Sequence, residues 1–214
     1  MGNKLLLSIQ QQVEQAITIL KKGGIVAFPT DTVYGLGASM NITQAVERVY
    51  QVKKRPRTMP LPLLLTNVSQ IGEVARLVPQ AAWLLAEKFL PGALTLVLFK
   101  SKSVPDIVTG KGETIAVRIP DHHVPLALAQ GVGTPIAGTS ANLSGSPSAL
   151  TAEDVRAQLG DKVDLIIDGG RCPLGKESTI VDLTGENPLI LREGAISGEE
   201  LKRVCPSIAF KEGG

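Results

Sequence analysis

The chain has 214 residues, of which 43% are hydrophobic and 20% charged, the proportions of a soluble globular protein with one sizeable core. A formal net charge of +2 favours an anionic partner only weakly, and 3% aromatic residues leave few rings for stacking single-stranded nucleic acid. Two cysteines exclude a disulfide framework, and no apolar run is long enough for a signal peptide or a membrane span. Composition therefore predicts a cytoplasmic protein without membrane attachment.

Helices and strands are predicted to alternate along most of the chain. Apolar periodicity and capping residues predict helices over residues 8–22, 43–53, 79–90 and 151–160, with a last short helix after 197. Strands are predicted, in chain order, within "GGIVAFPT", "LPLLLT", "ALTLVLFK", "TIAVRIP", "TPIAGTSAN", "VDLIIDGG", "TIVDLT" and "PLILREG". The first strand is predicted to enter a loop, "DTVYGLG". The pattern predicts an α/β protein with a mixed sheet, because consecutive strands near the C-terminus do not fit pure βαβ winding.

The stretch "GRCPLGKES", residues 170–178, differs from a nucleotide-binding P-loop in two ways. Glu177 stands where the P-loop has a hydroxyl, and the segment that follows has the alternation of a strand rather than a helix. Two alternatives remain. The stretch is either a glycine-rich turn between strands or a turn that shapes another site with Ser178 and Thr179.

The basic stretch "KKRPRTMP" is the strongest candidate for an anion site. Lys53 and Arg55 lie where a helix ends, and Pro56 and Pro60 stiffen the following loop, which reduces the entropy lost on gripping a ligand. The same cations could instead stabilise the helix C-terminus through its dipole.

Other polar groups follow or interrupt buried strands. "TSANLSG" supplies small donors, "FPTDTVYGLG" supplies Thr32, and Arg118 and Arg192 each interrupt an apolar strand. Each could also belong to a turn or a sheet edge. The adjacent pair His122 and His123 is predicted to lie in a surface loop without metal. Together these groups indicate anion binding by positioning and charge, without a covalent nucleophile.

Five segments in this order, "FPTDTVYGLG", "KKRPRTMPLPLLL", "TSANLSGSPS", "GGRCPLGKESTIVD" and "ILREGAI", resemble the YrdC/Sua5 family of threonylcarbamoyl-AMP synthases. The resemblance covers about residues 9–203. It implies an open, twisted mixed sheet flanked by helices around a basic cavity. It also implies one YrdC-like domain over residues 1–214, without the C-terminal domain of longer Sua5 proteins.

The implied reaction forms threonylcarbamoyl-adenylate and pyrophosphate from L-threonine, bicarbonate and ATP, with Mg²⁺ accompanying ATP. Its product supplies the modification of adenosine 37 in tRNA through downstream tRNA threonylcarbamoyl-transfer proteins. The resemblance assigns catalysis to Lys53 and Arg55 and threonine binding to Thr32, Arg118 and Ser178. Nucleotide binding is assigned to Lys53, Arg55, Met59, Ser140, Asn142, Ser148 and Arg192.

Met59 departs from the family pattern, which often has Lys or Asn at this position. A polar nucleotide contact is therefore expected to be missing or to be supplied by Arg57.

Two other functions share the basic loop. An RNA-binding protein could use the cavity for tRNA or double-stranded RNA, and a synthase could carbamoylate a different acceptor, as the YrdC-like domain of a hydrogenase maturation protein does. RNA binding does not need the small polar pocket around Ser140, Asn142 and Ser178, so a response to threonine distinguishes the readings.

Overall fold

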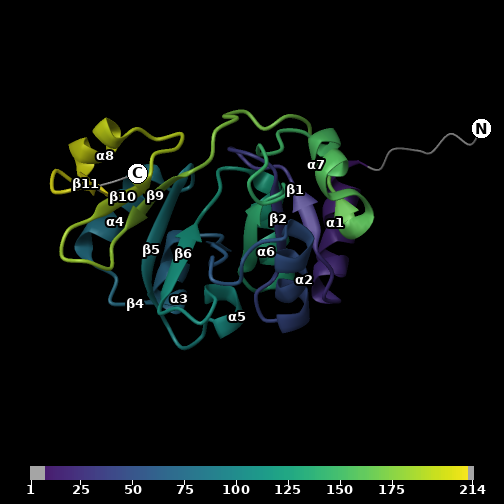
Figure 1. Cartoon of the computed structure of the whole chain (residues 1–214), viewed down its shortest axis with the longest axis horizontal. Helices are drawn as coiled ribbons and strands as arrows, with labels where there is room; N and C mark the ends of the chain where they lie inside the picture. Colours follow the sequence, from purple (N-terminus) through teal and green to yellow (C-terminus); the bar gives the residue numbers. More distant parts are fainter. Residues whose placement is uncertain (1–7, 212–214) are drawn as a thin grey trace, which may run out of the picture.

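The computed structural model describes residues 8–211 and contains one continuous, strongly mixed sheet with helices on both sides (Figure 1). The helices are α1 (Ile9–Lys21), α2 (Thr43–Lys53), α3 (Ile71–Val74), α4 (Gln80–Phe89), α5 (Asp106–Thr109), α6 (His123–Val132), α7 (Ala152–Leu159) and α8 (Gly198–Val204), with single turns η1 (Val68–Gln70) and η2 (Gly160–Lys162). The strands are β1 (Val26–Phe28), β2 (Gly35–Ser39), β3 (Leu63–Leu64), β4 (Ala75–Arg76), β5 (Leu94–Lys100), β6 (Thr114–Arg118), β7 (Ile136–Ser140), β8 (Leu165–Ile166), β9 (Thr179–Asp182), β10 (Leu189–Arg192) and β11 (Ala209–Phe210). The α/β class and the mixed sheet are confirmed.

The sheet order is β11-β10-β9-β5-β6-β3-β7-β2-β1-β8, with β4 paired to β5. The short strand β3 joins two halves of this order, because Leu63 and Leu64 pair in parallel with β6 and antiparallel with β7. One half carries β5, β9 and β10 with α4 and α8, and the other carries β1, β2 and β7 with α1, α2 and α6 (Figure 1). The halves are therefore joined at their centre by a seam of two residues.

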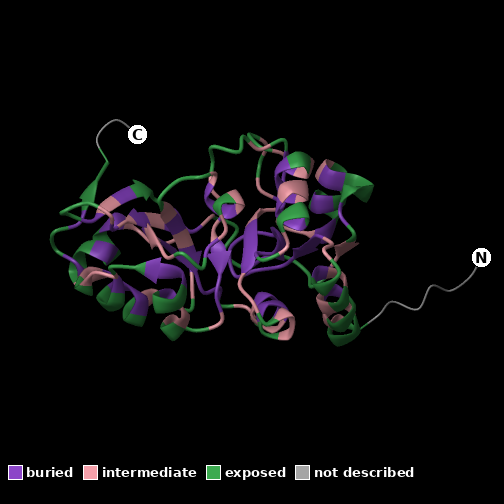
Figure 2. Cartoon of the chain, turned by 90° about the horizontal axis from the view of Figure 1, so that it is seen from below, coloured by how far each residue is buried: buried purple, intermediate pink, exposed green. Residues whose placement is uncertain are grey.

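Two hydrophobic cores cover opposite faces of the sheet around β1. Ala27 points into the core that contains α2, whereas its neighbours Val26 and Phe28 point into the core made with α1 and α6. Figure 2 shows buried strands enclosed by helices whose outer sides are exposed.

The predicted helices are confirmed. Helix α2 occupies Thr43–Lys53, and α7 and α8 begin at capping boxes formed by Thr151 with Asp154 and by Ser197 with Glu200. The side-chain oxygen of each cap residue accepts from a backbone N–H three residues later.

Two sequence predictions are wrong. Residues 35–37, expected in a loop, belong to β2; a Cβ on Gly37 would lie 2.5 Å from Cγ2 of Ile136, so glycine is used because neighbouring strands pack closely. His122 and His123, expected in a surface loop, begin α6. His122 Nδ1 accepts from the Val124 N–H at 3.2 Å and caps that helix.

Candidate functional site

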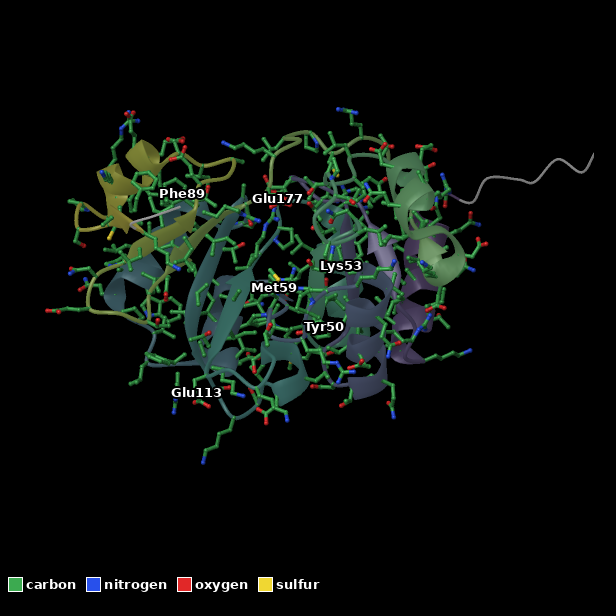
Figure 3. The ribbon with its side chains drawn as sticks, in the orientation of Figure 1. Tyr50, Lys53, Met59, Phe89, Glu113 and Glu177 are labelled. Carbon is green, nitrogen blue, oxygen red and sulfur yellow. The ribbon has the colours of Figure 1, made fainter. Side chains whose placement is uncertain are left out.

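A cavity of about 470 Å³ lies where the two halves of the sheet meet, and residues from both halves line it. All but one of the sequence-predicted site residues are among its lining residues: Thr32, Lys53, Arg55, Met59, Arg118, Ser140, Asn142, Ser178 and Arg192. Figure 3 shows Lys53, Met59 and Glu177, which belong to two distant segments, around the middle of the molecule. The volume is in the range of small-molecule sites.

Lys53, at the C-terminal end of α2, is 1% exposed and reaches across to the segment after β7. Its ammonium donates to the carbonyl of Ser140, to the Asn142 carbonyl at 2.6 Å and to Asn142 Oδ1 at 3.0 Å. These bonds use all three N–H donors of a lysine. Lys53 therefore lines the cavity, but in the free protein its charge holds the Ser140–Asn142 segment in place.

Burial lowers the pKa of Lys53 to about 8, and the nearby positive charge of Arg55 contributes to that shift. Asn142 is equally engaged: its Nδ2 donates to the Ser146 carbonyl at 2.6 Å. Lysine and asparagine thus form one buried network that shapes this wall of the cavity.

Arg55 is hydrogen-bonded to the backbone of the proline-containing loop that follows it. Its Nε donates to the Met59 carbonyl at 3.1 Å and its Nη2 to the Pro60 carbonyl at 3.0 Å. Because a guanidinium has five N–H donors, three remain for a ligand. The Met59 side chain lines the cavity and is 48% exposed.

Arg118, at the end of β6, is the most strongly held cation of the site. Its Nε donates to the Gly92 carbonyl at 3.0 Å, its Nη1 to Thr32 Oγ1 at 2.8 Å and its Nη2 to Asp31 Oδ1 at 2.6 Å. Burial lowers the pKa of Arg118, and the charge of Asp31 opposes that shift. Two of its N–H donors remain, one on each η nitrogen, so a carboxylate could still bind there.

Ser178 and Arg192 meet on the opposite wall. The hydroxyls of Ser178 and Thr95 lie 2.8 Å apart, and Arg192 Nη2 donates to the Ser178 carbonyl at 2.9 Å. Arg192 Nη1 also forms an ion pair with Glu177. The segment "KEST" therefore shapes the cavity as part of a turn that leads into β9, which confirms that no helix follows the near P-loop.

Three residues considered from the sequence lie outside the lining. Ser148 donates through Oγ to Glu177 Oε1 at 2.7 Å, one residue removed from the cavity. Arg57 forms an ion pair with Glu47 and does not line the cavity, so its contact with the nucleotide in place of Met59 stays a prediction. Lys176 is exposed and does not line the cavity.

Sequence reasoning missed Asp31, Thr95 and Glu177 as members of the site. A threonine within the apolar strand "LTLVLF" was a usable signal, since a buried hydroxyl needs a partner. Asp31 carried no such signal, because its role depends on Arg118 from a distant strand. Its Oδ2 is buried and has no hydrogen-bond partner among residues 8–211.

The charges of the cavity favour an anionic ligand. Four basic side chains line it (Lys53, Arg55, Arg118 and Arg192), against one acidic side chain, Glu177. Within residues 8–211, no group of three or more His, Cys, Asp or Glu side chains could hold a metal ion.

None of the helices within residues 8–211 has the length and apolar character needed to cross a membrane.

Known proteins resemble this chain in sequence and in structure. The family profile Sua5_yciO_yrdC, described as telomere recombination, matches residues 18–194. Threonylcarbamoyl-AMP synthase of Bacillus subtilis is 41% identical over 203 residues, which are 94% of this chain and 59% of that protein. Threonylcarbamoyl-AMP synthase of Pyrococcus abyssi is 40% identical over 95% of this chain and 62% of that protein. The chain thus spans about three fifths of the length of these relatives.

Solved structures agree with this relationship. The structure of P. abyssi Sua5 complexed with L-threonine superposes with a TM-score of 0.92 at 40% identity, covering 96% of this chain and 60% of that one. E. coli YciO superposes with a TM-score of 0.82 at 32% identity, covering 90% of this chain and 93% of that one. Because the profile matches most of the sequence and YciO is matched along nearly its whole length, the chain belongs to the Sua5/YciO/YrdC family.

Proposed function

We propose that this protein forms L-threonylcarbamoyl-AMP and pyrophosphate from L-threonine, bicarbonate and ATP. The main support is one cavity that contains two sets of polar side chains. Lys53, Arg55 and Arg192 would serve a triphosphate, and Thr32 and Arg118 would serve an amino acid. Relatives named threonylcarbamoyl-AMP synthase, and the L-threonine complex of P. abyssi Sua5, support the choice of substrates.

The proposed reaction has two steps. The threonine amine bonds to carbon dioxide, which comes from bicarbonate, and loses a proton to give a carbamate. A carbamate oxygen then bonds to the α-phosphorus of ATP while the bond to the bridging oxygen breaks and pyrophosphate leaves with that electron pair. Neither step needs a covalent bond to the protein.

The side chains would act by positioning and by charge. Arg118 would hold the threonine carboxylate through its two remaining donors, with the Thr32 and Ser178 hydroxyls beside the amino acid. Arg55 and Arg192 would bind phosphate oxygens on which negative charge accumulates, with Ser140 at the same wall. Mg²⁺ arriving with ATP would neutralise further phosphate charge. Alignment of this kind contributes about 7–11 kcal/mol in well-oriented model reactions.

Lys53 and Asn142 have a more indirect role in this proposal. Their side chains bond to each other and to the Ser140–Asn142 backbone, so they would preorganise the segment that receives the nucleotide. Ser148 would reach a phosphate only if its bond to Glu177 were exchanged.

The decisive experiment is mass spectrometry of the products formed from ATP, labelled L-threonine and ¹³C-bicarbonate. We expect an adenylate that carries both labels, together with pyrophosphate in equal amount. ATP consumption that does not depend on threonine would contradict the proposal. RNA binding in a protein that neither binds threonine nor forms this product would favour the RNA-binding alternative.

A mixed anhydride of a carbamate and a phosphate is an activated acyl donor, which suits the transfer of its threonylcarbamoyl group to another molecule. In this proposal downstream tRNA threonylcarbamoyl-transfer proteins in the cytoplasm use it to modify tRNA. Titration of the protein with tRNA measures whether tRNA itself binds.

A further inference from the structure

Glu177 is the single acidic residue among those that line the cavity, and it lies among the groups assigned to the nucleotide. Its carboxylate forms an ion pair with Arg192 Nη1 and accepts from Ser148 Oγ at 2.7 Å. Figure 3 shows Glu177 close to the gap between the two halves of the molecule. A carboxylate therefore occupies two groups that the proposed function reserves for phosphate.

The main chain and the side chain of Glu177 are held very differently. The Glu177 carbonyl accepts from the Ala195 N–H at 2.8 Å, and a Cβ on Gly194 would lie 2.2 Å from that carbonyl oxygen, so the backbone is closely packed. The carboxylate, by contrast, bonds within residues 8–211 to Ser148 and Arg192, and the Glu177 side chain is 35% exposed. The side chain can therefore turn away without disturbing the fold.

Glu177 and a phosphate offer the same chemistry to these partners. Both present anionic oxygens that accept from a guanidinium and a hydroxyl. Arg192 gives Nε and Nη2 to the Ser178 carbonyl and Nη1 to Glu177, so a phosphate that pairs with Nη1 competes with the Glu177 carboxylate for that position. The charge of Glu177 also opposes the lowering of the pKa of Lys53 and of Arg55, which indicates that its field reaches the rest of the cationic wall.

We propose that Glu177 is an internal counter-ion that takes the place of a phosphate on Arg192 and Ser148 and is displaced when a polyphosphate binds. This inference rests on the proposed function for its choice of nucleotide. Competition from Glu177 therefore lowers the affinity of this site for anions. A ligand must present enough phosphate groups to replace Glu177, and pyrophosphate is released more readily because the carboxylate competes for its position.

The test is Glu177→Gln, which keeps the shape of the side chain and removes its charge. Calorimetric titration measures the binding of a non-hydrolysable ATP analogue and of pyrophosphate, each with and without Mg²⁺. We expect both ligands to bind roughly three- to tenfold more tightly to the variant, as expected when a half-exposed competing ion pair is removed. Unchanged or weaker binding would overturn the proposal. Weaker binding only with Mg²⁺ would instead make Glu177 a ligand of the metal.

Glu113→Gln is the matched control. Glu113 also forms an ion pair with an arginine, Arg76, at 3.0 Å, and it does not line the cavity. It lies at the far edge of the molecule in Figure 3. The control removes the same charge from the protein. If both variants bound the ligands more tightly to the same extent, the change in net charge would explain the effect and the proposal would be overturned.

A second comparison separates competition from general repulsion. In an Arg192→Ala background, Glu177 has no guanidinium to occupy, so adding Glu177→Gln should change affinity by less than about twofold. An equal gain in both backgrounds would show repulsion through space and reject displacement. The readout is independent of turnover: a protein that binds polyphosphates as described but makes no threonylcarbamoyl-AMP would overturn the proposed function and leave this inference standing.

Discussion

At the scale of single residues, cations that line the cavity are hydrogen-bonded to the protein itself before any ligand binds. Lys53 gives its three donors to protein oxygens, and Arg118 gives three of five. Such preorganisation lowers the cost of binding, because side chains that are already fixed lose little entropy when a ligand arrives.

The guanidinium of Arg118 is expected to be essential for binding threonine. Arg118→Lys keeps the charge but cannot reach the Gly92 carbonyl, Thr32 Oγ1 and Asp31 Oδ1 together. The loss of about 1–3 kcal/mol should raise KM for threonine roughly tenfold or more. Steady-state kinetics measures it, and ATP-analogue binding should change by less than about threefold.

Arg48→Lys is the control for Arg118→Lys. Arg48 forms a bidentate pair with Asp164 at 2.8 and 3.0 Å and does not line the cavity. If both variants raise KM for threonine equally, the guanidinium of Arg118 has no specific role in binding threonine.

Lys53 should make stability depend on pH in the alkaline range. Its pKa is about 8 in the folded protein and 10.5 in an exposed lysine, so between these pH values the unfolded chain binds more protons at this site. The cost of burying the charged form is therefore relieved as pH rises above about 8. We expect the free energy of unfolding of wild type, relative to Lys53→Met, to rise with a slope of at most about 1.4 kcal/mol per pH unit.

Urea unfolding of both proteins between pH 7 and pH 10 provides the measurement. A difference that is flat, or that falls as pH rises, would contradict the lowered pKa of Lys53.

At the scale of elements, the cavity exists because two strands of different halves are joined through a very short one. The two-residue strand β3 pairs with both β6 and β7, and its own Leu64 and the preceding Pro62 line the cavity. The turn before β9 closes the opposite side. Its position depends on Gly194, which follows β10 and packs directly on the Glu177 and Ser178 backbone.

Gly194→Ala should therefore destabilise the protein and displace this turn. An added Cβ would lie 2.2 Å from the Glu177 carbonyl oxygen and 2.4 Å from the Ser178 carbonyl carbon, and backbone atoms cannot move aside cheaply. We expect a loss of about 1–3 kcal/mol of stability and weaker binding of the ATP analogue. Gly72→Ala in α3, where nothing lies within 4 Å of the added carbon, should change stability by less than about 0.5 kcal/mol or increase it. Chemical denaturation of both variants measures the difference, and equal stabilities would refute the close-packing argument.

At the scale of the whole molecule, ligands are expected to join the two halves. The lining residues come from β2 and β7 on one side and from β5, β9 and β10 on the other (Figure 1). A ligand that fills the cavity contacts both halves and so stabilises the folded chain by mass action.

The ATP analogue and L-threonine should each raise the melting temperature. At about a hundredfold excess over Kd a ligand adds about 2.7 kcal/mol, or roughly 5–10 °C for a domain of this size. Differential scanning calorimetry measures the shift, with L-valine as the matched control because it has the shape of threonine without the hydroxyl. If valine stabilises as well as threonine, the hydroxyls of Thr32 and Ser178 do not select the amino acid.

The sequence by itself determined the features that depend on neighbouring residues. The helix over Thr43–Lys53 and the capping boxes at Thr151 and Ser197 follow from local periodicity and local hydrogen bonds, so they were predicted before the structure. The identities of the site residues followed from motif resemblance, and the cavity brings together all of them except Ser148.

Tertiary structure decided the features that depend on distant partners. Residues 35–37 form a strand because β1 and β7 flank them, although glycine alone disfavours one. Arg57 turns to Glu47, Lys53 is occupied by the Ser140–Asn142 segment, and Glu177 meets Arg192 across a turn. Charge and donor number can be read from a residue's identity, but the partner that uses them is set by packing between segments far apart in the chain.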